Sequence, residues 1–193
     1  LFNIWRPKDK NICAAISNKN KTSLVYIPNN NILSTEISIL ESYANMIKEH
    51  FKNSFIKKKI KVFTFENIIK NHKIKLEKFD FLKIDIEGSE YRILEDLIKY
   101  QNNISGLVIE FHNIDLHIER ILEFIKNFNL KLVHIHGQNP GDKDYLDING
   151  DPIQIELTFS SYSQYTSIGP CIPSHLDQPS DPRYKDIDLK FSI

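Results

Sequence analysis

Acidic residues and histidines follow three apolar segments in the middle of the chain. They are Asp85 and Glu87 after the first segment, Glu110 and His112 after the second, and His136 at the end of the third. Carboxylates and imidazoles can act as general bases toward a hydroxyl group, or they can bind a divalent cation that acidifies it. Because carboxylates at buried strand ends are usually paired or ligand-bound, these residues are candidates for a site.

The spacing of the three segments indicates how they would be brought together. Residues 79–86, 106–111 and 130–136 each have the short apolar pattern of a buried strand, and amphipathic helical patterns separate them. Asp85 and Glu110 are 25 residues apart, and Glu110 and His136 are 26 residues apart, which is close to the length of a strand–helix–strand unit. This alternation predicts an α/β fold with a parallel sheet, whose carboxyl ends meet at one edge.

Further elements are expected on either side of this core. The patterns predict strands at 11–17, 23–27 and 152–159, a helix at 35–51, a helix through Asn71 capped by Thr64, and a short strand at 187–191. The lysine run at 57–59 is interpreted as a solvated turn, and residues 160–193 are interpreted as an irregular, proline-containing arm.

Composition limits the classes of function. The chain has 193 residues, 41% hydrophobic and 26% charged, which is typical of one globular domain over residues 1–193. Its net charge of zero argues against binding to nucleic acid or to an anionic membrane, and no apolar run approaches the roughly 18 residues of a membrane helix. Two cysteines are too few for a disulfide framework or a thiolate metal site. We therefore expect a soluble, cytoplasmic protein; its oligomeric state is not readable from the sequence.

Three strings resemble the C-terminal half of FkbM-type methyltransferases. They are VFTFENII at 62–69, FDFLKIDIEGSE at 79–90 and VIEFH at 108–112, with weaker similarity in AAIS at 14–17, HGQN at 136–139 and ELTF at 156–159. The resemblance implies a Rossmann-like class I methyltransferase sheet, mostly parallel with helices on both faces. It also implies S-adenosylmethionine as cofactor and the hydroxyl group of a sugar or secondary metabolite, a small molecule or a glycan, as methyl acceptor.

The resemblance also implies roles for individual residues. Asp85 would lie at the methyl-transfer centre, and Glu110 and His112 would face the acceptor. The residues assigned to catalysis are Asp85, Glu110, His112 and His136. The residues assigned to cofactor binding are Ala15, Ile16 and Ser17 near the adenine, and Asp85, Glu87 and Gly88 at the cofactor and substrate edge. No residue is assigned to a metal, although a divalent cation stays open as an alternative to a protein base.

One departure from the family pattern is large. Family members carry a first strand with a Gly-rich turn, followed by a second strand that ends in an acid for the ribose hydroxyls. No glycine precedes Gly88 in this sequence, which starts at Leu1 and has Met46 as its sole methionine. We therefore expect an N-terminally truncated domain, which on its own would be inactive and would bind S-adenosylmethionine weakly or not at all.

Two other classes of function fit parts of the sequence. A metal-dependent hydrolase could use the same cluster of Asp85, Glu87, Glu110, His112 and His136, although His134-Ile135-His136 is the sole short string with the look of a metal motif. A non-catalytic, methyltransferase-like binding module is the third possibility, and its support is the expected truncation.

Overall fold

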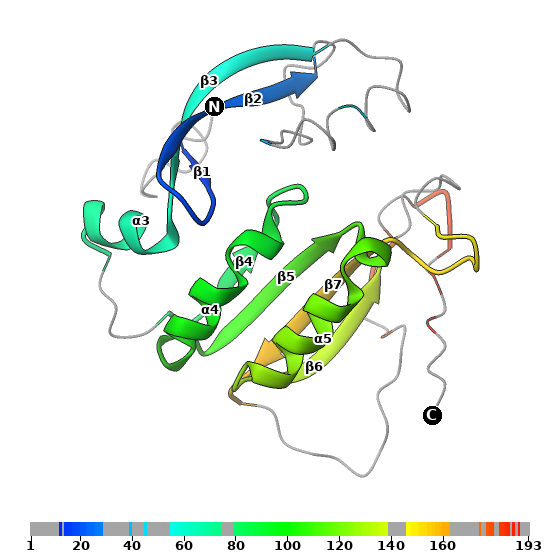
Figure 1. The fold of residues 1–193 in the computed structure, drawn as a ribbon. Helices are drawn as coiled ribbons and strands as arrows, with labels where there is room; N and C mark the ends of the chain where they lie inside the picture. Colours follow the sequence, from blue (N-terminus) through cyan, green and yellow to red (C-terminus); the bar gives the residue numbers. More distant parts are fainter. Residues whose placement is uncertain are drawn as a thin grey trace.

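The computed structural model describes residues 12, 14–28, 39, 45, 55–74, 79–138, 146–162, 174, 177–179, 182–185, 187 and 189. Within these residues the strands form two sheets, a three-stranded sheet of order β1-β3-β2 and a four-stranded sheet of order β4-β5-β7-β6 (Figure 1). Most of the helix predicted at 35–51, of the strand predicted at 187–191 and of the arm predicted at 160–193 lies outside the described residues.

The three-stranded sheet contains β1 (Ala15–Ile16), β2 (Lys21–Pro28) and β3 (Phe55–Phe63). β2 confirms the segment predicted at 23–27, and β1 lies within the segment predicted at 11–17. The turn expected at 57–59 is wrong, because these lysines lie within β3, which pairs antiparallel with β2. Their backbone completes the ladder while their flexible side chains stay exposed, with the Lys57 ammonium 5.2 Å from the centre of the Tyr26 ring.

Helix α3 (Phe65–Asn71) follows β3 directly and begins as the sequence predicts. The Thr64 hydroxyl accepts a hydrogen bond from the backbone N–H of Asn67 at 3.2 Å, which confirms Thr64 as the N-cap. Phe65 and Ile69 are buried on one side of α3, and the Phe65 ring lies 5.6 Å from that of Tyr100. This contact connects α3 to the second half of the fold.

The four-stranded sheet contains β4 (Leu82–Ile84), β5 (Gly106–His112), β6 (Lys131–Gly137) and β7 (Gln154–Ser160). The four strands predicted in this region are therefore confirmed, with β4 shorter than expected. β4 and β5 are parallel, and β7 pairs antiparallel with both β5 and β6. The prediction of a mostly parallel sheet is wrong, because β7 returns against β6 and enters the space between β5 and β6. β4, β5 and β6 still run in one direction, so their carboxyl ends share an edge.

Helices α4 (Leu94–Tyr100) and α5 (Ile118–Asn127) contact each other and lie on one face of this sheet (Figure 1). The sequence predicts helices on both faces of the sheet, but α4 and α5 lie on the same face. The chain moves across the sheet in one direction, from β4 to β5 to β6, and crossovers of one hand then put both helices on one side. The core between the helices and the sheet is apolar; it includes Leu97, Leu107, Ile109, Phe111, Phe124 and Phe159. No helix among the described residues is long and apolar enough to cross a membrane.

Candidate functional site

His112, the last residue of β5, lies at the centre of a group of carboxylates. It is 2% exposed. Its Nδ1 atom lies 3.2 Å from Glu90 Oε1, and its Nε2 atom lies 3.5 Å from Glu87 Oε2, 3.9 Å from Glu110 Oε1 and 4.0 Å from Asp85 Oδ1. The structure thus brings together Asp85, Glu87, Glu110 and His112, as their positions at strand ends predict. We call these four residues and Glu90 the His112 cluster.

Glu90 is the member of the His112 cluster that the sequence analysis did not assign. It is fully buried, at the start of the short 3-10 helix η1 (Glu90–Arg92). Its Oε1 atom accepts hydrogen bonds from the backbone N–H groups of Ile86 at 3.1 Å and Gly88 at 3.2 Å. Glu90 therefore holds the loop after β4 and the His112 ring at the same time. The signal in the sequence was a carboxylate three residues after Glu87, but nothing there showed that it turns inward.

The loop after β4 has a backbone shape that few residues adopt. Glu87 has φ 53° and Gly88 has φ 87°, so two successive residues lie in the left-handed region. Glycine adopts this region freely, whereas a residue with a side chain loses about 1 kcal/mol or more there. Asn113, next to His112, also has φ 53°. Both chain segments that form the cluster therefore carry backbone strain, which the surrounding hydrogen bonds maintain.

The charges of the cluster determine which group is protonated. Burial disfavours the charged form of His112, but the hydrogen bond to Glu90 and the negative charges of Glu90, Glu87 and Glu110 outweigh it and raise the pKa of His112 to about 9. Burial, and then the charge of Asp85, raise the pKa of Glu110 above its ordinary value. At neutral pH His112 is therefore a cation, and Glu110 is a stronger base than an ordinary carboxylate. Of these two residues, Glu110 is the better general base.

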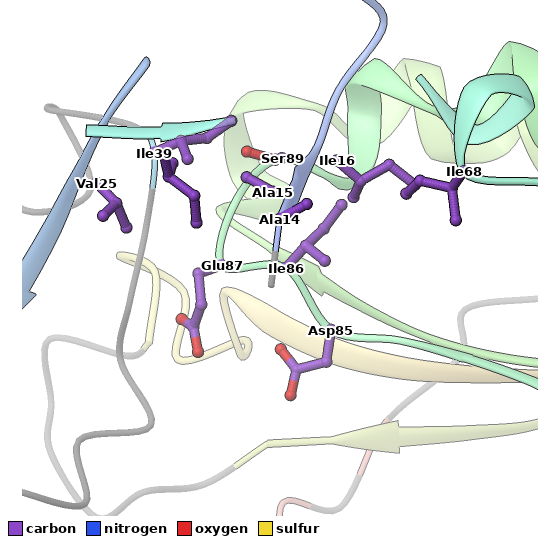
Figure 2. A pocket seen from close by; sticks show the side chains of 11 residues that line it. Ala14, Ala15, Ile16, Val25, Ile39, Ile68, Asp85, Ile86, Glu87 and Ser89 are labelled. Atoms are coloured by element: carbon purple, nitrogen blue, oxygen red, sulfur yellow. The ribbon is translucent and has the colours of Figure 1, made fainter. Parts of the chain in front are cut away.

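A pocket of about 420 Å³ lies between the three-stranded sheet and the loop after β4. Its apolar wall consists of Ala14, Ala15, Ile16, Val25, Ile39, Ile60, Ile68 and Ile86, and its polar groups are Asp85, Glu87 and Ser89. Figure 2 shows the two carboxylates together on one side of the pocket, with most of the apolar side chains on the other. Asp85 and Glu87 thus belong to the pocket and to the His112 cluster, so the two form one continuous site.

The pocket contains part of the set assigned to cofactor binding. Ala15 and Ile16 line it, together with Asp85 and Glu87, whereas Ser17 and Gly88 adjoin its lining residues in sequence. Ser17 is fully buried beside β3, and its backbone N–H donates to the Phe63 carbonyl at 3.0 Å. This hydrogen bond joins the residue after β1 to the end of β3. The predicted role of Ser17 in cofactor binding stays a prediction.

His136 lies on β6, at the edge of the sheet opposite β4. It is buried on β6 and stands opposite Glu156 of β7, which in turn stands opposite Glu110 of β5. Two strand spacings separate His136 from Glu110, which is about 10 Å between backbones. The three side chains share one face of the sheet, and the predicted catalytic role of His136 stays a prediction.

A family model described as the methyltransferase FkbM domain matches residues 2–132. This range contains every residue that lines the pocket and every member of the His112 cluster, whereas His136 and β7 lie beyond it. Neither a curated protein nor a solved structure matched the chain.

Proposed function

Because the chain belongs to the FkbM methyltransferase family, we propose that it transfers a methyl group from S-adenosylmethionine to a hydroxyl group of a sugar or secondary metabolite. The observation that supports this function most directly is the junction of the pocket with the His112 cluster. An apolar cavity and a set of bases meet at Asp85 and Glu87. The family match favours this activity over metal-dependent hydrolysis by the same residues.

The pocket offers groups that suit the proposed cofactor. S-adenosylmethionine has a flat adenine ring at one end and supplies an electrophilic methyl group on a positively charged sulfur. The apolar wall around Ala15 and Ile16 would hold the adenine, because burial of its faces removes apolar surface from water. The carboxylates of Asp85 and Glu87 would attract the positive charge. The residues present therefore fit this cofactor.

The cluster offers a way to remove the proton of an acceptor hydroxyl. Alkyl transfer to an alcohol needs correct positioning and a base for the departing proton. We assign the base to Asp85 or Glu110: the Asp85 side chain is 40% exposed and can reach an incoming acceptor, and the raised pKa of Glu110 suits proton acceptance. His112, as a buried cation, would hold both carboxylates in place through its charge.

The test is methyl transfer by the chain, and by the full product of its gene, with labelled S-adenosylmethionine and a panel of hydroxyl-bearing acceptors. We expect Asp85→Asn to lower the rate at least about 100-fold with little change in stability, because it removes a base and keeps the shape. Glu95→Gln, on the exposed side of α4, is the control and should keep the rate.

A pocket-filling variant tests cofactor binding separately. We expect Ile16→Trp to abolish binding of S-adenosylmethionine, measured by ligand-observed NMR, which also detects weak binding. Full activity in Asp85→Asn would disprove the assignment of Asp85. If neither protein binds the cofactor or transfers a methyl group, a non-catalytic binding module becomes the better description.

A further inference from the structure

We propose that Asp85, Glu87 and His112 form a binding site for a divalent cation such as Mn²⁺, with His112 as a ligand through Nε2. One possible ligand atom from each of the three residues lies within 4.8 Å of the others. Asp85 and Glu87 come from the loop after β4, and His112 comes from the end of β5. A cation could therefore bind all three with small movements of side chains.

The position of Glu90 is further evidence for a metal site, in addition to the positions of the three proposed ligands. Histidines that bind metals usually donate their other ring N–H to a carboxylate, which fixes the ring and its tautomer. Glu90 Oε1 lies 3.2 Å from His112 Nδ1, on the side of the ring away from Asp85 and Glu87. Glu90 is itself fully buried and held by two backbone N–H groups, so it can fix the ring rigidly.

The second carboxylate oxygen of Glu90 lies in an unfavourable environment. Its Oε2 atom is buried and has no hydrogen-bond partner within the part of the chain that the structure describes. A buried, incompletely bonded carboxylate is unfavourable unless its negative charge is needed. Support of a metal-bound histidine is such a need, because the carboxylate increases the basicity of the ring.

The charge balance around the site also favours a cation. The group comprises Asp85, Glu87, Glu90, Glu110 and Glu156 as acids, with Lys83 and His112 as bases. Even with His112 protonated, negative charge exceeds positive charge at this partly buried edge of the sheet. A divalent ion would offset the excess where the dielectric constant is lower than in water.

The ligand types suit Mn²⁺ better than Mg²⁺ or a structural Zn²⁺. The site supplies one imidazole nitrogen and two carboxylates, and the exposure of Asp85 leaves room for water ligands. Mg²⁺ prefers an all-oxygen octahedron, and structural Zn²⁺ prefers four nitrogen and sulfur ligands. Mn²⁺ accepts carboxylates and water and binds an imidazole more tightly than Mg²⁺ does.

The first test is titration of Mn²⁺ into the metal-free chain at pH 7, followed by calorimetry and by loss of the free-ion EPR signal. We expect one site, with Asp85→Asn and Glu90→Gln each weakening binding at least about tenfold. Glu156→Gln is the matched control: it removes a nearby acid that is no ligand, and we expect a change of less than about threefold. An equal loss in Glu156→Gln would reduce the site to general attraction by acids and would overturn the proposal.

A comparison of two metal ions tests the role of His112. Its Nε2 atom is the nitrogen that faces Asp85 and Glu87 in the proposed site. Because Mn²⁺ binds an imidazole more tightly than Mg²⁺ does, we expect Mn²⁺ to bind at least about tenfold more tightly than Mg²⁺. The same calorimetry measures both affinities. Binding of Mg²⁺ as tight as that of Mn²⁺ would show a site made of oxygens alone and would overturn the assignment of His112.

These experiments do not depend on methyl transfer. The Asp85 side chain is half-exposed, so Asp85→Asn should keep the fold, and circular dichroism would verify this. The test therefore holds even if variants of His112 fail to fold. Absence of Mn²⁺ binding in the folded chain would overturn the metal site and leave the proposed methyltransferase activity untouched.

Discussion

The two faces of the four-stranded sheet differ in their side chains, although the same strands form both: one face is apolar and packs in the core, and the other is polar. On the face that meets α4 and α5, Leu107, Ile109 and Phe111 of β5 are fully buried among apolar neighbours. On the opposite face the alternate residues of β5 include Glu110 and His112, which belong to the His112 cluster. Because successive side chains of a strand point to opposite faces, one seven-residue strand contributes both to the core and to the candidate site.

β7 repeats this division of roles. Leu157 and Phe159 are buried in the core, whereas Glu156 and Thr158 stand on the polar face, where Glu156 pairs with Lys83. The comparison teaches that the core can hold the polar face rigid without contributing polar atoms to it. Changes on the core face should therefore alter stability, and changes on the polar face should alter charge and binding. The following predictions test that separation.

The largest expected effect is a core truncation. Phe111 is fully buried, and its ring lies 5.5 Å from that of Tyr91 and 6.4 Å from that of Phe124. Phe111→Ala should lower the free energy of unfolding by about 3–5 kcal/mol, because it leaves a cavity in the core. Urea denaturation measures the change. Val108→Ala, on the opposite face of the same strand, is the control and should cost about 1 kcal/mol or less; equal losses would contradict the separation of the two faces.

The second effect is a pH dependence that arises on the polar face. The pKa of His112 is about 9 in the folded chain and 6.5 as its ordinary value, so folding strengthens proton binding. Its contribution is fully present below pH 6.5 and is lost as the pH rises through about 9, and it amounts to roughly 3 kcal/mol. Urea denaturation between pH 6 and 10 should therefore show falling stability.

A pair of histidine variants isolates this effect. His112→Gln should remove most of the slope between pH 6 and 10, whereas His72→Gln, just after α3 and outside the His112 cluster, should keep it. An unchanged slope in His112→Gln would mean that the charge of His112 does not stabilise the fold. In that case the four carboxylates around it would have to be held by other contacts.

The sequence predicted the site better than the sheet that carries it. The meeting of Asp85, Glu110 and His112 follows from strand order and length alone, because parallel strands end at one edge. The direction of β7 does not appear in its apolar pattern, which is the same for a parallel or an antiparallel strand. For that reason the sequence predicted the existence of β7 but not the mixed sheet.

Local backbone shape and distant contacts were harder to predict. The inward turn of Glu90 depends on left-handed angles at Glu87 and Gly88, and only the second of these residues suggests such angles. The hydrogen bond between His134 Nε2 and Asp177 Oδ1, at 2.7 Å, joins residues 43 positions apart. Neither position carries a pattern that indicates its partner, since a polar residue on a strand can pair with many polar residues of an irregular segment.

The smallest expected effect concerns the ion pair of Lys83 and Glu156. Lys83 on β4 reaches across β5 to hydrogen-bond Glu156 on β7, and the two side chains are 48% and 26% exposed. Water and salt screen a pair of this exposure, so a double-mutant cycle of Lys83→Met and Glu156→Gln should give a coupling energy of about 0.2–1 kcal/mol. That energy should shrink when the salt concentration rises. A salt-independent coupling energy above about 2 kcal/mol would mean that water is excluded from the polar face as it is from the core. The two faces would then differ in the polarity of their side chains and not in their access to water.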